Sequence, residues 1–149
     1  AFIGGTNDIS DHHERLSGFH SALKQFNIHQ HKPTITAATN RQGGRDAFAT
    51  LYAQYPATKA IICFNDVIAY GVVEAIRQHG LIPGKDIKVV GFDDLADSCL
   101  MSPSLSSVTI NADDIGKHTC QVLQELLNQG TPAVRTLVDV HLQVRASSQ

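Results

Sequence analysis

The chain has 149 residues, of which 42% are hydrophobic and 17% are charged, and this composition is typical of one soluble globular domain with a sizeable core. Its formal net charge of -2 and its pI near 6.5 leave no basic surface to neutralise a phosphate backbone, so these residues by themselves do not predict DNA binding. The cysteines at 63, 99 and 120 form no Cys-x-x-Cys pair, which predicts a reducing cytoplasm, and no apolar stretch approaches the roughly 18 residues of a membrane span.

The first third of the chain alternates between strand-like and helix-like segments. Residues 1–5 look like the end of a strand that is already under way, so we expect the chain to be a fragment of a longer protein. Asp11 and Glu14 form a capping-box pattern, and the apolar residues after them recur with helical spacing up to Phe26. The segments that follow are a β-branched strand at 34–37, a turn at 40–44 and a second helix at 47–55.

A polar elbow separates an apolar run from a helical pattern in the middle of the chain. The run from Ile61 to Phe64 is too short for a buried helix and predicts a central strand, whereas apolar residues recur every three to four positions from Val67 onward. Side chains at the carboxyl ends of parallel strands face the crevice where ligands bind, so Asn65 and Asp66 are candidate binding residues. The alternative is that one of them only caps the helix, by accepting a hydrogen bond from a free N–H group.

A second apolar strand ends in acidic residues in the same way. Residues 87–92 predict this strand, and Asp93 and Asp94 follow it. The recurrence places polar groups at two strand ends that would face one crevice. Strand and helix alternate about three times up to this point, and each helix must carry the chain back before the next strand begins. The sequence therefore predicts an α/β fold with a doubly wound parallel sheet.

The last third of the chain departs from this alternation. The predicted segments are a linker at 102–104, an extended segment at 105–110 and a helix at 113–129 that Gly130 ends. Apolar residues occupy every second position from 138 to 144, within a strand predicted at 135–144, which indicates an edge strand with one solvated face. Residues 145–149 lack side chains suited to packing, and we expect this tail to fray.

Several short motifs, taken in order along the chain, resemble those of one protein family. They are Ile3-Gly4-Gly5, Arg15-Leu16-Ser17-Gly18-Phe19, Phe64-Asn65-Asp66, Val90-Gly91-Phe92-Asp93-Asp94, Pro103-Ser104-Leu105 and Val144-Arg145-Ala146-Ser147. In order and spacing they resemble the effector-binding domain of the lactose- and galactose-repressor (LacI/GalR) transcription regulators over the whole chain. The resemblance implies a periplasmic-binding-protein-like fold and a sugar-sensing bacterial repressor of carbohydrate metabolism.

In such proteins the ligand lies between two lobes, and the resemblance implies that this chain supplies the C-terminal one. Residues 1–104 and 131–149 would form that lobe, 105–130 would join the N-terminal lobe of an intact protein, and the domain that reads operator DNA would be absent. Without the second lobe, the helix at 113–129 loses its usual partner. We expect its apolar face to dock on another copy or to fold back.

The resemblance also indicates which residues contact the effector. Arg15 matches the arginine of the family's Arg-Leu-x-Gly-Phe motif, whose planar donors reach adjacent hydroxyls or a carboxylate. Asn65 can donate and accept at one hydroxyl, and Asp93 can take two hydroxyl protons from one ring, so the set suits a neutral polyol such as a sugar. Thr39 and Asn40 fall where many relatives place an aromatic residue that stacks on the sugar, and neither can stack. The alternatives are a surface ion pair for Arg15 and a turn role for Asp93.

The resemblance further implies a homodimer, because family members pair through their C-terminal lobes. The contacts would come from the helix after the first polar elbow and from the loop after the second. The residues at these places are Val72, Val73, Ile76, Leu95, Leu100 and Met101. Two of them, Leu100 and Met101, lie in a serine-rich loop, where apolar side chains are hard to explain as the surface of a monomer.

Other functions find less support in the sequence. The histidines at 12–13 and 29–31 invite a metal site, but adjacent helical positions point to different sides and the second pair lies in a loop, so we expect no metal. No phosphate-binding glycine loop and no nucleophile paired with a base support an enzyme, and no cofactor is expected. A periplasmic sugar-binding protein for transport stays open as the alternative function, because it shares this lobe and many of the motifs.

Overall fold

The structure is a computed structural model that describes residues 1–5, 10–28, 33–129 and 137–149, and a six-stranded sheet runs through it. The strands are β1 Phe2–Gly4, β2 Thr34–Thr36, β3 Ala60–Cys63, β4 Lys88–Asp93, β5 Ser106–Thr109 and β6 His141–Gln143. They lie side by side in the order β2-β1-β3-β4-β5-β6. The pairs from β2 to β5 are parallel, and β6 is antiparallel to β5.

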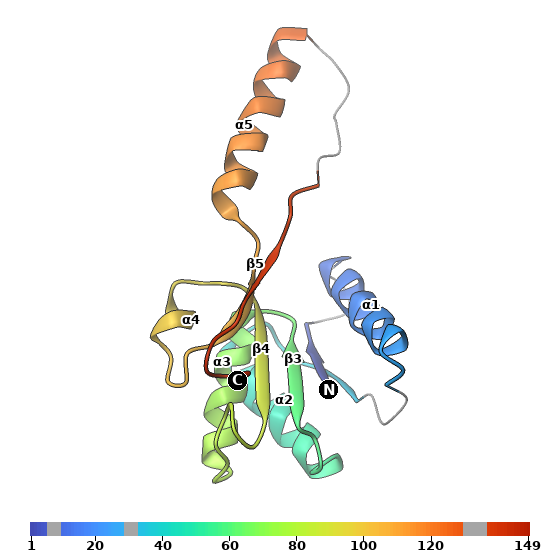
Figure 1. Cartoon of the computed structure of the whole chain (residues 1–149), viewed down its shortest axis with the longest axis vertical. Coiled ribbons are helices and arrows are strands. Elements are labelled where there is room, and N and C mark those ends of the chain that lie inside the picture. The colour runs from blue at the N-terminus through green and yellow to red at the C-terminus, as the bar shows by residue number, and fades with distance from the viewer. Residues whose placement is uncertain (6–9, 29–32, 130–136) are drawn as a thin grey trace.

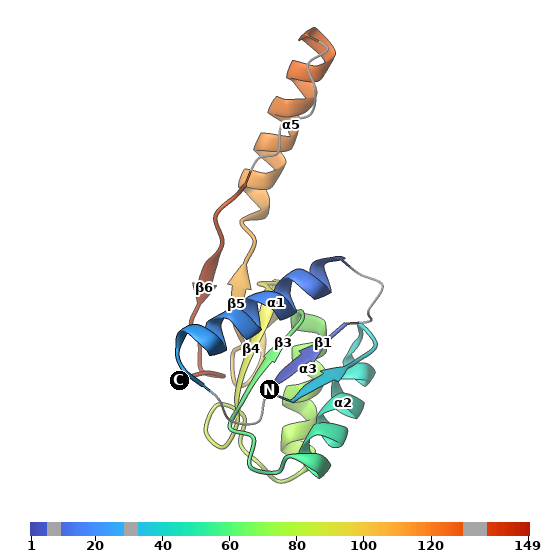
Figure 2. The same ribbon diagram turned by 90° about the vertical axis from the view of Figure 1, so that its right-hand side faces the viewer.

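Helices cover both faces of this sheet. The helices of the described residues are α1 Ser10–Gln25, α2 Arg41–Gln54, α3 Asp66–Gln78, α4 Asp97–Leu100 and α5 Ala112–Gln129. Figure 2 shows α1 on one face, with α2 and α3 together on the other. Parallel strands that alternate with helices on both faces confirm the predicted doubly wound α/β fold.

The core lies mainly between the sheet and the two helices α2 and α3. Its largest fully buried side chains include Phe2, Ile3, Phe48, Leu51, Ile61 and Ile68. The helical spacing predicted after residue 66 turns Val72, Val73 and Ile76 toward this core, and all three are 0% exposed. The prediction that these three residues contact a second copy is therefore wrong, because a side chain that its own chain covers completely presents no surface to a partner.

The helix α2 already begins at Arg41, within the segment that the sequence predicted as a turn, and it packs closely against α3. A Cβ on Gly44 would lie 2.2 Å from the carbonyl oxygen of Ile68, so the backbone of α2 runs directly against α3. The side chain of Asn40 caps the helix by accepting a hydrogen bond from the N–H of Gly43 at 2.8 Å. Glycine at this place therefore serves helix packing rather than a turn.

The C-terminal tail is anchored, which corrects the prediction that residues 145–149 fray. Ser147 is fully buried, and its N–H donates to the carbonyl of Ser104 at 3.0 Å. Its hydroxyl donates to the carbonyl of Val89 at 2.6 Å and accepts from the N–H of Ser106 at 2.8 Å. Hydrogen bonds to buried backbone groups, rather than apolar contacts, stabilise this tail, so its serines are suited to their place.

The helix α5 projects away from the sheet (Figure 1), and its isoleucine and leucine side chains are exposed. Leu123 and Leu127 are 56% and 78% exposed. The prediction that this helix folds back is wrong, because α5, which begins directly after Asn111 in the left-handed region at φ 48°, extends away from the sheet (Figure 1). Docking on another copy stays a prediction. Within the described ranges, neither α5 nor any other helix is long and apolar enough to cross a membrane.

The last two strands show where the chain leaves the sheet. β5 pairs with β4 over four residues, so the departure begins after Thr109 and not at residue 105 as predicted. β6 pairs with β5 at the outer edge, as expected for an edge strand. Val140, Leu142 and Val144 are more than half exposed, because β6 is short and lies at the rim of the sheet. The start of the predicted strand at 135–136 and Gly130 lie outside the described residues.

Candidate functional site

The strand order opens a crevice at the carboxyl ends of the central strands. The chain passes from β1 to β2 on one side and then returns to β3 on the other, so the order reverses between β1 and β3. Such reversals are where doubly wound sheets bind ligands. Asn65 directly follows β3, Asp93 ends β4, and Arg15 reaches both strand ends from α1.

Arg15 joins the two strand ends. Its Nη1 donates to the carbonyl of Phe64 at 2.5 Å, and its Nη2 donates to Oδ1 of Asp93 at 3.4 Å. The guanidinium also lies over two aromatic rings, 4.5 Å from the ring centre of Phe64 and 3.8 Å from that of Phe92. The Arg15 side chain is 19% exposed. Arg15 therefore lies mostly buried at the two strand ends, and it also lies 4.0 Å from the exposed carboxylate of Asp11, which is an ion pair of the kind that the sequence left open as an alternative.

Asp93 faces Arg15 because the backbone turns sharply at the end of β4. Asp93 and Asp94 both lie in the left-handed region, with φ 104° and 51°, where a residue with a Cβ is strained. The carboxylate of Asp94 accepts a hydrogen bond from Arg145 at 2.7 Å. Burial raises the pKa of Asp93 above its ordinary value, and the nearby Arg15 charge opposes this rise. The turn thus directs one carboxylate toward each arginine.

Asn65 and Asp66 have different roles at the start of α3. The Asn65 Oδ1 accepts a hydrogen bond from the N–H of Ile68 at 3.0 Å, so Asn65 and not Asp66 caps the helix. Its amide nitrogen still carries two donors that can face a ligand. Asp66 is 0% exposed and accepts hydrogen bonds inside the protein, so it is not a ligand contact. Capping and ligand binding, which the sequence presented as alternatives, are compatible for Asn65.

The predicted residues Thr39 and Asn40 follow the neighbouring strand β2 and are both exposed. A Cβ on Gly5 would lie 3.5 Å from Oγ1 of Thr39 and 3.3 Å from the ring of Phe64. Thr39 therefore lies at the same edge of the sheet as the aromatic ring beneath Arg15. Asn40 uses its side-chain oxygen to cap α2.

A hollow of about 370 Å³ opens beside Arg15. Asp11, Glu14, Arg15 and Phe92 line it, and of these only Arg15 was predicted as a site residue. Asp11 and Glu14 were interpreted as a capping box, although helical spacing places Asp11, four residues before Arg15, on the same face of the helix as Arg15. Phe92 is the last apolar residue before a polar elbow, as Phe64 is, and this shared position is the signal that could have identified both rings.

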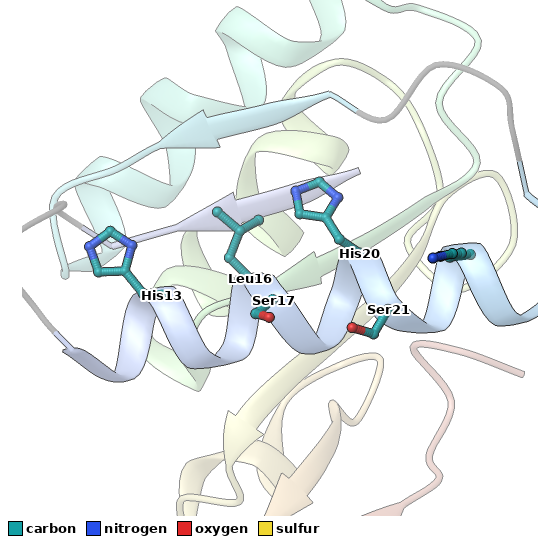
Figure 3. A pocket seen from close by; sticks show the side chains of 6 residues that line it. His13, Leu16, Ser17, His20 and Ser21 are labelled. Atoms are coloured by element: carbon teal, nitrogen blue, oxygen red, sulfur yellow. The ribbon is translucent and has the colours of Figure 1, made fainter.

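Two other hollows lie away from this crevice. One of about 430 Å³ follows α1, and a larger one of about 680 Å³ lies among mostly apolar residues at the amino ends of β1 and β3. Figure 3 shows the side chains along the first, which include His13, Leu16, Ser17, His20 and Ser21. Asn65 and Asp93 line neither of these hollows, and they do not line the hollow beside Arg15. In the described part of the chain no group of three His, Cys, Asp or Glu residues could hold a metal ion, and residues 29–31 lie outside it.

Three of the residues predicted to contact a second copy remain accessible. Leu95 is 42% exposed, Leu100 is 80% exposed and Met101 is partly exposed. They belong to the loop after β4 and to α4, beside an ion pair in which Arg41 lies 3.8 Å from Asp97. This apolar patch with flanking charges is the part of the predicted dimer contact that the fold leaves available.

The sequence is similar to those of transcription regulators. The family model of the periplasmic binding protein-like domain matches residues 1–148. A probable HTH-type transcriptional repressor ExuR of Bacillus subtilis is 32% identical over 149 residues, which are 99% of this chain and 45% of the relative. The lactose operon repressor of Klebsiella pneumoniae is 31% identical over 134 residues, 90% of this chain and 38% of the relative. The chain thus spans less than half the length of these curated relatives.

Solved structures give the same result over nearly the whole chain. The lac repressor dimer bound to operator and the anti-inducer ONPF matches with a TM-score of 0.92 and 26% identity, over 99% of this chain and 44% of the other. The complex of the transcriptional regulator CelR with cellobiose matches with a TM-score of 0.91 and 25% identity, over 99% of this chain and 46% of the other.

Proposed function

This chain belongs to the periplasmic binding protein-like family, in which its curated relatives are repressors of the lactose-repressor type, and on that premise we propose that it is the C-terminal lobe of the sugar-sensing domain of a bacterial repressor of carbohydrate metabolism. The observation that carries the proposal is the contact of Arg15 with the ends of both β3 and β4. It gathers the predicted donor and acceptor groups into one crevice.

The chemistry of this crevice suits a neutral polyol. Asn65 offers two N–H donors, Asp93 offers acceptor oxygens, and Arg15 offers the guanidinium N–H groups that its present partners leave free. Arg15 is already paired with Asp93, and Asp11 and Glu14 line the same hollow, so the local charge does not favour a carboxylate or a phosphate. Hydroxyl groups, which donate and accept, complement this set.

We propose further that two copies pair through the patch of Leu95, Leu100 and Met101, and that operator DNA is bound by a domain outside these residues. The lac repressor structure, described as a dimer bound to operator, supports this arrangement. A cytoplasmic location is part of the proposal, because a bacterial repressor meets its operator there. The relatives reported above are repressors, which favours this function over periplasmic transport, and the proposal contains no catalytic step.

A titration of the ¹⁵N-labelled chain with D-glucose, D-galactose and cellobiose, followed by amide chemical shifts, tests the sugar site. One lobe alone leaves much of the ligand's surface exposed to water, so we expect a dissociation constant on the order of millimolar. Shift changes should cluster at the ends of β3 and β4 and around Arg15. They should vanish in Asp93→Asn and persist in Asp113→Asn, which changes an exposed carboxylate on α5. No response to any of the three sugars, or shifts scattered away from the strand ends, would refute the proposal.

A further inference from the structure

Asp66 is a buried carboxylate that the proposed sugar contacts do not use. It is 0% exposed, and its Oδ2 accepts hydrogen bonds from the N–H of Leu95 at 2.8 Å and from the hydroxyl of Ser98 at 2.6 Å. Its Oδ1 accepts from the hydroxyl of Ser107 at 2.6 Å. A Cβ on Gly91 would lie 2.1 Å from this Oδ1, so β4 passes close to the carboxylate. Asp66 therefore links three segments by hydrogen bonds, namely the start of α3, the segment that follows β4, and the strand β5.

Two of these hydrogen bonds fix the strained turn at the end of β4. Leu95 directly follows Asp94, and Ser107 accepts a second hydrogen bond, from the N–H of Asp94 at 3.0 Å. Left-handed conformations such as those of Asp93 and Asp94 persist only where the surroundings impose them. Asp66 supplies that constraint, directly at Leu95 and through Ser107 at Asp94.

We propose that Asp66 is the positioning residue of the sugar site, which keeps Asp93 in the conformation that sets its carboxylate against Arg15. The inference rests on the proposed function for the role of the site, but its test needs no sugar. Asp66 itself touches no ligand in this scheme. Without its hydrogen bonds, Asp93 and Asp94 would relax toward extended backbone angles, and the Asp93 carboxylate would turn away from the guanidinium.

Ser98 and Ser107 provide matched variants for the test. Both are fully buried, and both hydroxyl oxygens lie 2.6 Å from Asp66. They differ in their second partner, which is the hydroxyl of Tyr70 for Ser98 and the N–H of Asp94 for Ser107. Ser107→Ala removes the acceptor of the Asp94 N–H directly, whereas Ser98→Ala leaves that hydrogen bond in place. If Asp66 positions Asp93, a change at Asp66 that keeps the Ser107 hydroxyl should loosen the turn as Ser107→Ala does, and if Asp66 only stabilises the fold, that change should act like Ser98→Ala.

The substitution Asp66→Asn should resemble Ser107→Ala. A backbone N–H can only donate, so the new amide must keep its oxygen toward Leu95 and Ser98. Its NH₂ group then faces Ser107, whose hydroxyl proton loses its acceptor. The hydrogen bond from Asp94 to Ser107 weakens as a result.

Two NMR measurements on folded variants decide the question. One is the hydrogen exchange rate of the Asp94 amide, and the other is the pH titration of the Asp93 carboxyl carbon. After correction for global stability, we expect the Asp94 amide to exchange about tenfold faster in Ser107→Ala and Asp66→Asn than in Ser98→Ala. The Asp93 titration should be displaced in the first two variants only, and Ser107→Thr, which keeps the hydroxyl, should restore both signals.

The outcomes separate this inference from the proposed function. Equal exchange of the Asp94 amide in the two serine-to-alanine variants, or an unchanged Asp93 titration in Asp66→Asn, would overturn the positioning role. If the unmodified chain binds none of D-glucose, D-galactose and cellobiose, the proposed function fails, while the Asp94 and Asp93 signals still decide whether Asp66 fixes the turn.

Discussion

The substitution Arg15→Lys tests how much the strand-end contacts of this residue stabilise the fold. Lysine keeps the positive charge but replaces the planar fork of donors by one ammonium group. It cannot stack between the rings of Phe64 and Phe92, and it can reach only one of the two oxygens that the guanidinium now contacts, on Phe64 and on Asp93. The change therefore keeps the positive charge but removes the planar donor group and its stacking on the two rings.

The expected loss follows from the contacts that lysine cannot replace. Each arginine–ring contact contributes about 0.5–1 kcal/mol or somewhat more when it is shielded from water. One hydrogen bond from a charged donor adds about 1.5–3 kcal/mol. Because Arg15 is 19% exposed and Asp93 is 26% exposed, solvent screens the ion pair in part, and we give it no separate weight. The free energy of unfolding should therefore fall by about 2.5–5 kcal/mol, the sum of two ring contacts and one hydrogen bond.

Urea unfolding followed by circular dichroism measures this loss. Arg77→Lys is the matched control, because Arg77 is exposed in the last turn of α3 and should change the unfolding free energy by less than about 0.5 kcal/mol. The urea dependence should stay the same in both variants, since the surface exposed on unfolding does not change. A loss in Arg15→Lys no larger than that of the control would show that Arg15 is a solvated surface residue that does not join the ends of β3 and β4.

Three further predictions concern the tail, the dimer and pH. Ser147→Ala removes the side-chain partner of the N–H of Ser106 and of the carbonyl of Val89, and it should lower the free energy of unfolding in urea by about 2–4 kcal/mol. The control Ser17→Ala changes an exposed serine and should cause no such loss, and equal effects of the two substitutions would mean that the tail is not anchored. Leu100→Asp should weaken self-association in sedimentation without changing stability, and a monomeric unmodified chain at high concentration would contradict the proposed pairing. The raised pKa of Asp93 means that its contribution to stability is fully present below the ordinary value of 3.8 and is lost as pH rises through the folded pKa. The stability of the unmodified chain relative to Asp93→Asn should therefore decline as pH rises from 3.8, and a rise measured in urea midpoints would refute this.

Local patterns in the sequence were sufficient for the sheet and for the position of the crevice. In the run from Ile61 to Phe64 every side chain except that of Ile62, which is 40% exposed, is buried, and the polar elbow after the run marks the end of the strand. The apolar run and the polar elbow can both be read from neighbouring residues. The tail failed as a prediction because its serines are stabilised by backbone groups of β4 and β5, which are distant in sequence. No pattern within residues 145–149 contains that information.

The site also combines features that can be read from neighbouring residues with contacts between residues that are distant in sequence. Arg15, Asn65 and Asp93 were predicted as site residues because a motif and two strand ends carry them, and each of these is readable within a few residues. Asp66 was interpreted as a cap or a ligand contact, since both are local roles, whereas its actual partners come from the loop after β4 and from β5. A buried carboxylate is tolerated only where several donors converge on it, and convergence is a property of the folded chain. The group that constrains the site is for this reason the one that sequence alone was least able to assign.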